Sequence, residues 1–591
     1  MNKLLSILAI IGLGVLTYSN SFFCSFHFDD DAYIVNDFAI KNLHNLADIW
    51  NVCPCRFITF LSLAVNYHFH QLNVFGYHVF NLAIHLGSAI LVWWLVLLTF
   101  STPAMKEEKI AAHANIIALF AGLIFVSHPL QTEAVTYIWQ RAASMVAFFY
   151  LASLSFYVKS RLLDSRPQAE PAIGPGIFYY LLSLAAAVAA MFTKENAITL
   201  PLMILFYEIT FIKPKKNLDW LQLFPFLLAF FIIPKTMMLT MSARFQEIRT
   251  IVEGPGGISP LDYLLTQFRV MMTYIRLLFL PFNLNLDYDY PIFKSFFETP
   301  VLISFLSLAA IFYFAKRMFS KYRLISFSIF WFFLTLLPES SILPQADVIF
   351  EHRLYLPLAG YCIFLPSGIY YLCIAASPRG EAIPKRIISL MVVILSLILA
   401  LNTFLTYQRN KIWKNEIVLW QDVVQKSPHK ARPYINRGWA YYNQGNFIQA
   451  MSDYTKAIEI NPDLIYPYDD RGLIYARQGE LTRAISEYNK AIAINPYYAK
   501  VYDDRGVTYL KQDHYLQALA DFNKAIKVNP EYVDAYNDRG GFYAQQGKLS
   551  QAMIDYKKSI KIDPDQVDIR FKLFDLSGQK SAAPSNWHFS K

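Results

Sequence analysis

The sequence has little charge and few cysteines. Only 16% of its 591 residues are charged, five are cysteine, and the mean hydropathy is +0.30. So low a charge content excludes an ordinary soluble protein of this length and indicates a membrane protein with several spans. The cysteines form no C-x-x-C pair and no zinc spacing, so Cys53 and Cys55 are expected to be free thiols rather than a disulfide. The net charge of +9 comes mostly from residues beside apolar runs, which argues against nucleic-acid binding.

The N-terminus also lacks an A-x-A cleavage pattern, so its apolar run is expected to stay as a helix. Runs long enough to span a bilayer predict about eleven helices. They lie near 4–20, 75–99, 114–127, 134–157, 177–192, 197–212, 218–233, 300–315, 324–338, 354–376 and 386–406. Basic loops alternate with loops of little positive charge, which predicts the N-terminus inside and the C-terminus outside. Segment 262–282 contains Arg269 and Arg276, so it is expected to lie on the outer interface.

A period of 34 residues follows the apolar part of the chain. Prolines at 428, 462, 496, 530 and 564 keep it, and so do four Arg-Gly pairs that begin at Arg437, Arg471, Arg505 and Arg539. Small residues and aromatic residues hold the same register, which is typical of tetratricopeptide repeats with two helices each. The fold class is therefore all-α: a polytopic membrane domain over 1–412, a repeat solenoid over 413–575, and a disordered tail over 576–591.

Polar residues gather in the loops that this topology places outside. They are Asp29, Asp30 and Asp31, then Arg56, His128, Glu133, Arg141, Lys194, Glu195, Glu351, His352 and Arg353. Carboxylates can take a proton from an acceptor hydroxyl, and arginines can hold a phosphate by paired hydrogen bonds. The inventory suits transfer of a sugar from a phosphate-linked membrane lipid. The alternative for any one member, such as Lys194, is a solvated or helix-capping role.

Several of these stretches carry a resemblance. "FDDDAYIVN", "HPLQTEAVTYIWQRAASMVAFFYLASLSFY", "TKENAITLPLMILFYE", "LNLDYDYP" and "FEHRLYLPLAGYC", followed by repeats, resemble the transmembrane and tetratricopeptide-repeat-containing O-mannosyltransferase family and its bacterial relatives. The resemblance implies a C-type glycosyltransferase that moves mannose or another hexose, with inversion, from a polyprenyl-phosphate carrier to a hydroxyl of a protein or glycan. The compact solenoid and the lack of an extended signal region favour a bacterial inner membrane, with the repeats in the periplasm.

The resemblance also implies roles for particular residues. The family's acidic pair matches Asp29 and Asp30 as general base, while Asp31 matches a variable position. His128, Glu133 and Arg141 match a second-loop motif, and Glu351, His352, Arg353 and Tyr355 match a late motif. Arg56 is kept, but Cys55 and Phe57 depart from the common Tyr-Arg-Pro. With Lys194 and Glu195, these residues form the expected donor site; Mg or Mn is compatible with its oxygen ligands, although no motif requires either.

The solenoid offers a second expected site. Asn436, Asp469, Asp470, Asp503, Asp504, Asn537 and Asp538 precede the Arg-Gly pairs and predict an acceptor groove for an extended polypeptide. The alternative is that these aspartates pair with Arg471, Arg505 and Arg539 of adjacent repeats. Two other functions also remain open from the sequence: a noncatalytic repeat scaffold for envelope assembly, and a transporter of lipid-linked sugars.

Overall fold

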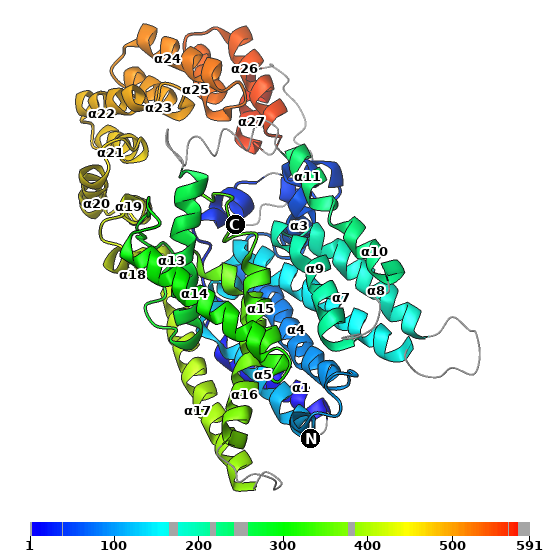
Figure 1. The fold of residues 1–591 in the computed structure, drawn as a ribbon. Coiled ribbons are helices and arrows are strands. Elements are labelled where there is room, and N and C mark those ends of the chain that lie inside the picture. Colours follow the sequence, from blue (N-terminus) through cyan, green and yellow to red (C-terminus); the bar gives the residue numbers. More distant parts are fainter. Residues whose placement is uncertain are drawn as a thin grey trace. The chain divides into compact units, whose positions relative to one another are not determined.

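The structure is a computed structural model, and it describes residues 3–37, 39–164, 175–212, 220–240, 258–375, 385–564 and 566–576. Every regular element within these ranges is a helix, as the sequence predicts (Figure 1). The chain divides into two compact units, Met1–Lys426 and Ser427–Lys591. From residue 577 on, the predicted disordered tail lies outside the described residues.

The first unit is a bundle of mostly apolar helices. Its α-helices are α1 (Lys3–Thr17), α2 (Leu46–Val52), α3 (Phe57–His70), α4 (Val74–Phe100), α5 (Ala114–Ser127), α6 (Thr132–Thr136), α7 (Arg141–Asp164), α8 (Pro175–Met191), α9 (Leu200–Tyr207), α10 (Trp220–Ala229), α11 (Ile232–Thr240), α13 (Pro260–Phe279), α14 (Thr299–Met318), α15 (Arg323–Leu336), α16 (Pro357–Ala375), α17 (Lys385–Asn410) and α18 (Glu416–Lys426). The shorter helices that matter for the site are η1 (Asp31–Val35), η3 (Pro54–Arg56), η5 (Pro129–Gln131), η6 (Ile138–Gln140), η7 (Glu195–Thr199) and η9 (Glu351–Leu354).

Eight helical segments within the described ranges are long and apolar enough to cross a membrane. They are Val74–Phe100, Lys109–Ser127, Ile138–Leu163, Glu195–Ile212, Trp220–Leu239, Thr299–Met318, Pro357–Ile374 and Arg386–Lys414. Three shorter apolar helices, α1, α8 and α15, correspond to the remaining predicted runs. The sequence analysis missed one apolar element: Leu46–Val52 and Pro54–His70 form a pair bent by 106° that would count as a ninth span. The helix predicted over 262–282 is present as α13, and its position at the interface stays a prediction.

Two apolar cores hold the first unit together. The larger runs through the bundle, where α4 packs against α5 and α7, and α7 against α8. The smaller lies beneath the first polar loop and contains Ile34, Phe60, Trp139, Trp413 and Trp420. The segment that carries the aspartate triplet is therefore folded against apolar side chains instead of extending into water.

α18 packs with the first unit. Asp422 accepts a hydrogen bond from Arg409 at 2.8 Å, and Lys426 Nζ donates to the Leu284 carbonyl at 2.7 Å. The division between the units therefore falls after α18, somewhat later than the boundary predicted at 412/413.

The second unit is a solenoid of helix pairs. Its helices are α19 (Ala431–Asn443), α20 (Phe447–Ile460), α21 (Tyr466–Arg477), α22 (Leu481–Ile494), α23 (Ala499–Leu510), α24 (Tyr515–Val528), α25 (Val533–Gln545), α26 (Leu549–Ile562) and α27 (Val567–Leu576). The glycine of each Arg-Gly pair lies under an aromatic ring of the second helix. A Cβ on Gly472, for example, would stand 2.5 Å from the Tyr488 ring, so glycine is what lets the two helices approach closely.

Candidate functional site

Asp30 ties the first loop to the second. Its carboxylate accepts hydrogen bonds from the backbone N–H of His27 at 2.9 Å and of Trp139 at 2.7 Å, and the side chain is fully buried. Burial raises the pKa of this carboxyl well above its usual range, although the two N–H donors oppose the shift. Both oxygens thus serve the fold, which is a positioning role more than a reactive one.

Asp29 is the more accessible member of the pair. It is half-buried, and the Tyr137 hydroxyl accepts a hydrogen bond from its backbone N–H at 3.0 Å and also interacts with its carboxylate. Tyr33 stacks on Trp139 at 4.1 Å beside it. Burial and the charge of Asp29 raise the pKa of Tyr33, while Arg56 lowers it, so the Tyr33 phenol lies within electrostatic range of both charges. The half-buried Asp29 and the Arg56 guanidinium therefore act on the same phenol.

Arg56 and Glu195 form a paired contact between the first and third polar loops. Arg56 donates from Nε at 2.9 Å and from Nη2 at 3.1 Å to the two carboxylate oxygens. About a quarter of each side chain stays exposed, 25% for Arg56 and 29% for Glu195. The bent pair places Cys53 and Cys55 beside this contact as free thiols, as the sequence predicts. Arg56 is accordingly the predicted cation that a ligand can reach most easily.

Lys194 pairs with Glu339, a residue that the sequence analysis missed. The Nζ to Oε1 distance is 3.0 Å, and the two side chains are 8% and 13% exposed. Burial raises the pKa of Glu339, but the charges of Lys194 and Arg353 outweigh it and leave the pKa below its usual value. Glu339 follows α15 without any motif around it, so only its acidic character close to a helix end could have suggested it.

Glu133 and His352 join the second-loop motif to the late motif. Nδ1 of His352 lies 2.6 Å from Oε1 of Glu133, and the His352 backbone N–H donates to Oε2 at 3.0 Å. Burial raises the pKa of Glu133 to about 8, and burial together with Lys194 lowers the pKa of His352 well below its usual value. These directions favour a neutral pair in which protonated Glu133 donates to the imidazole.

Glu351 takes its partners from the loop that precedes α14. It accepts hydrogen bonds from the Asn285 backbone N–H and, at 2.7 Å, from the Tyr288 hydroxyl. Burial raises its pKa to about 7, with Glu133 adding to the shift and Arg409 opposing it. Asn285 and Tyr288 belong to "LNLDYDYP", one of the stretches that carry the family resemblance. The sequence analysis did not predict that these two residues would contact Glu351.

Four predicted residues are turned toward structural partners. His128 bridges the Leu130 N–H and, at 3.0 Å, the Leu278 carbonyl, and so fixes the turn before Glu133. Arg141 is fully buried and donates to Asn66 at 2.7 Å as well as to carbonyl oxygens. Arg353 donates to the Asp347 and Val348 carbonyls, and the Tyr355 hydroxyl bonds His85 at 2.7 Å inside the bundle. These contacts hold the loops in place, and among the predicted cations Arg56 is the most exposed.

The ionic pairs of the solenoid differ from the predicted alternative. Each repeat arginine pairs with an acid on the second helix of its own repeat, so pairing with the aspartates of adjacent repeats is wrong for these arginines. The pairs are Arg437 with Asp453 (2.6 Å), Arg471 with Glu487 (3.3 Å), Arg505 with Asp521 (2.7 Å) and Arg539 with Asp555 (2.7 Å). The two members of each pair are sixteen residues apart in the sequence, which is the separation between facing positions on the first and second helices of a repeat.

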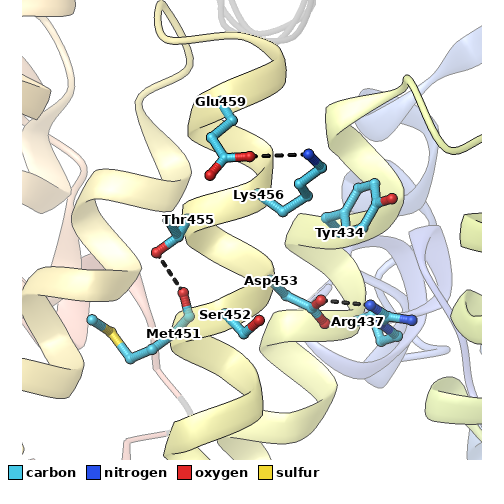
Figure 2. A pocket seen from close by; sticks show the side chains of 8 residues that line it. All are labelled: Tyr434, Arg437, Met451, Ser452, Asp453, Thr455, Lys456 and Glu459. Atoms are coloured by element: carbon cyan, nitrogen blue, oxygen red, sulfur yellow. Dashed lines mark hydrogen bonds and ion pairs between the residues drawn. The ribbon is translucent and has the colours of Figure 1, made fainter.

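The predicted acceptor residues have other partners. Lys500 lies between Asp469 and Asp504, with 2.7 Å from Nζ to Oδ2 of Asp504. Asp470 bonds the Tyr454 hydroxyl, and Asn537 bonds Ser559 and Gln566. Of the pockets, one lies between α19 and α20 (Figure 2), where Arg437 is paired with Asp453 and Lys456 with Glu459, so its cations are already neutralised.

The described residues contain no group of three or more histidine, cysteine, aspartate or glutamate side chains arranged to hold a metal ion.

Comparison with known proteins identifies the repeats first. Family models described as tetratricopeptide repeats match residues 431–464, 472–513 and 504–567. Solved structures with similar repeats include MamA, at 22% identity and a TM-score of 0.23 over 26% of this chain and 89% of that one, and YrrB, at 19% identity and a TM-score of 0.23 over 27% and 82%. Together with the apolar helices, the repeats define a multi-pass membrane protein that carries a tetratricopeptide-repeat solenoid.

The resemblance drawn from the motifs is also confirmed. Protein O-mannosyl-transferase Tmtc3 of Drosophila melanogaster is 27% identical over 543 residues, covering 78% of this chain and 56% of that protein. Protein O-mannosyl-transferase TMTC3 of Homo sapiens is 23% identical over 511 residues, covering 78% and 52%. Human TMTC4 is 24% identical over 507 residues, covering 76% and 65%. The chain spans about half the length of the first of these curated relatives.

Proposed function

We propose that the protein is a membrane glycosyltransferase that moves mannose or another hexose from a polyprenyl-phosphate carrier to a hydroxyl of a protein or glycan. Two observations support this. The curated relatives are named protein O-mannosyl-transferases. In addition, polar loops far apart in the sequence meet through Asp30 with Trp139, Arg56 with Glu195, and Glu133 with His352. This convergence of loops carries the proposal, because a chain that merely anchors the repeats would not need it.

In the proposed reaction Asp29 acts as the general base. It takes the proton of the acceptor hydroxyl, the acceptor oxygen forms a bond to the anomeric carbon, and the bond from that carbon to the phosphate oxygen breaks. The products are the glycosylated acceptor and the polyprenyl phosphate, and inversion follows from attack on the face opposite the phosphate. Asp30 holds the loop so that Asp29 faces the acceptor, since its own oxygens are occupied.

Arg56 and Lys194 receive the phosphate in this proposal. Both are already paired with carboxylates, Glu195 and Glu339, which keeps the cations in position before the donor arrives. Cations fixed beforehand stabilise the charge that develops on the departing phosphate without having to rearrange. The buried Glu133–His352 pair holds the late motif, and with it Arg353, behind these two groups.

An apolar pocket between α1, α5 and α17 suits the polyprenyl chain of the donor. Leu13, Leu123, Leu399 and Phe404 are among its lining residues. Beside it, the Asn20 side chain donates to the Tyr407 carbonyl at 2.9 Å, and Asn20 precedes the aspartate loop in the chain. We place the site on the outer face of a bacterial inner membrane, following the charge of the loops.

A matched pair of variants tests the base. Asp29→Asn and Asp31→Asn each remove one charge from the same loop, and only the first should abolish transfer. Because general base catalysis contributes about 10²- to 10⁴-fold, kcat/KM should fall by that factor in Asp29→Asn. The assay uses purified full-length protein with radiolabelled polyprenyl-phosphate mannose and a serine- and threonine-containing peptide.

Four outcomes would contradict the proposal. Equal rates for wild type and Asp29→Asn would remove the base assignment. Equal losses in both variants would point to a general effect of loop charge. Movement of the lipid-linked sugar across a vesicle membrane without transfer to any acceptor would favour the transporter, and inactivity of the wild type with every hexose donor would favour the scaffold.

A further inference from the structure

Six aspartates on the first helices of three consecutive repeats form one acidic row. The acidic row consists of Asp469, Asp470, Asp503, Asp504, Asp534 and Asp538, on α21, α23 and α25. The first helices of these neighbouring repeats pack against one another. The charge of Asp504 raises the pKa of all five other members, so the row is one continuous electrostatic surface across the three repeats.

One end of the acidic row is neutralised by the chain itself. The Lys500 ammonium lies between Asp469 and Asp504 and contacts both carboxylates. This contact shows that a primary ammonium fits between the carboxylates of two successive repeats.

The other end has no such partner. Asp503 is 3% exposed, its Oδ1 has no hydrogen-bond partner, and among the described residues no ion pair reaches Asp503, Asp534 or Asp538. Asp534 interacts with the Tyr532 hydroxyl, and the charge of Lys572 acts on Asp538 without contacting it. Burial raises the pKa of Asp503 to about 9, and the charges of Asp538, Asp504 and Asp534 add to the shift, whereas Lys500 opposes it. At neutral pH Asp503 therefore holds a proton, and its buried Oδ1 has no hydrogen-bond partner. A cation that reached this end would stabilise the ionised carboxylate and take the place of that proton.

The arrangement does not suit a metal ion. No three acidic side chains of the described solenoid converge closely enough to coordinate one. Carboxylates spread along successive repeats instead match cations spread along a chain, and an extended polypeptide is the ligand that offers cations in that form.

We propose that the acidic row binds an extended polypeptide through its lysine or arginine side chains, one of which enters between Asp503 and Asp538. Charge complementarity favours this occupant over nucleic acid or an anionic membrane, both of which the row would repel. The inference rests on the proposed function only in naming the bound chain as an acceptor. Binding itself needs neither the donor sugar nor Asp29.

The test measures binding of labelled peptides to the purified full-length protein by fluorescence anisotropy. The probe is an extended serine-, threonine- and alanine-containing peptide with interspersed lysines, and its matched forms carry glutamine or glutamate in place of lysine. The lysine peptide should bind at least about tenfold more tightly than the glutamine peptide, and added salt should weaken it because exposed charges are screened. The glutamate peptide should not bind.

Two double variants make the test specific. Asp503→Asn with Asp538→Asn should weaken the lysine peptide by about tenfold or more, while Glu531→Gln with Asp568→Asn, which replaces the same number of acidic groups at exposed positions of the solenoid, should leave affinity within about twofold. The row variant should also unfold at a higher temperature than wild type at neutral pH, because the asparagine at 503 needs no proton in order to be buried neutral. A purely structural role for these aspartates would instead lower the unfolding temperature.

Each remaining outcome has a defined meaning. Equal binding of the lysine and glutamine peptides, or equal losses in both double variants, would overturn the proposal, and so would preferred binding of an anionic polymer. If Asp29→Asn abolishes transfer but keeps peptide binding, both proposals stand. If peptide binding is as expected and no sugar transfer occurs, the proposed function fails while the acidic row keeps its ligand.

Discussion

The buried pair of Lys194 and Glu339 offers a prediction whose size follows from the structure. In Lys194→Met, Glu339 loses its cation, and its Oε2 already lacks a hydrogen-bond partner. Breaking a buried pair by removing one member typically costs about 3–5 kcal/mol. Protonation limits the cost at pH 7, because neutralising a glutamate of ordinary pKa there requires about 3.5 kcal/mol. We therefore expect Lys194→Met to lower the free energy of unfolding by about 3 kcal/mol.

The same reasoning fixes the pH dependence and its sign. In the wild type the pKa of Glu339 is lowered, so its contribution is present above the unfolded pKa and is lost as pH falls through the folded pKa. In Lys194→Met the carboxyl is buried without its cation, so its folded pKa should lie above the unfolded one. The destabilisation should then be large near neutral pH and should shrink as pH falls toward the unfolded pKa of about 4.3.

The double variant Lys194→Met/Glu339→Gln separates charge from packing. It removes both members of the pair and should regain stability to within about 1 kcal/mol of wild type, which is about 2 kcal/mol more stable than Lys194→Met; the single variant Glu339→Gln completes the cycle that gives the coupling energy. Equilibrium unfolding of the purified protein in mixed micelles, followed by tryptophan fluorescence, measures all four forms. Equal instability of the single and double variants would refute the reasoning. A double variant that folds but has a raised KM for the donor would support phosphate binding by Lys194.

Two further predictions concern the solenoid. Gly540→Ala should destabilise the solenoid by about 1–3 kcal/mol, because the new Cβ would stand 2.8 Å from the Tyr556 ring. Gly541→Ala on the same helix has its nearest contact at 3.8 Å and should stabilise the solenoid by up to about 1 kcal/mol. Thermal unfolding compares the two variants, and equal effects would contradict the packing argument. Because the folded pKa of Asp503 is raised to about 9 and that of Asp538 to about 6, the folded solenoid holds more protons than the unfolded chain. The free energy of unfolding should therefore fall as pH rises from about 5 to about 8, by up to about 1.4 kcal/mol per pH unit for each extra proton. Asp503→Asn should flatten that slope, and an unchanged slope in this variant would contradict the raised pKa of Asp503.

Much of the helical architecture could be predicted because its causes are local. Apolar runs predicted α1, α4, α5, α7 to α10 and α14 to α17, since each run is long enough to satisfy its own backbone within a bilayer. The 34-residue period predicted the helix pairs from α19 to α26, and the position of Gly472 opposite Tyr488 gives its physical reason. The bent pair of α2 and α3 escaped detection because it is divided at Pro54, and neither half forms an apolar run long enough to span a bilayer.

The candidate site could be predicted only in part. The motifs named loops that contact one another in the structure, where Asp30, Arg56, Lys194 and His352 have partners from other loops. They gave no indication that Glu339 would face Lys194, because a lone glutamate after an apolar helix looks the same whether it meets a cation or water.

The sequence by itself determined the class of each segment: which runs are apolar helices, where the repeats begin, and which loops carry acids and cations. Only the tertiary structure decided the role of each polar group, since it turned Arg141 into the bundle, set Asp30 against two backbone donors, and left Asp29 and Arg56 within reach. The reason is physical. Helix periodicity acts over a few residues of one segment, whereas burial and charge pairing depend on which distant loops meet.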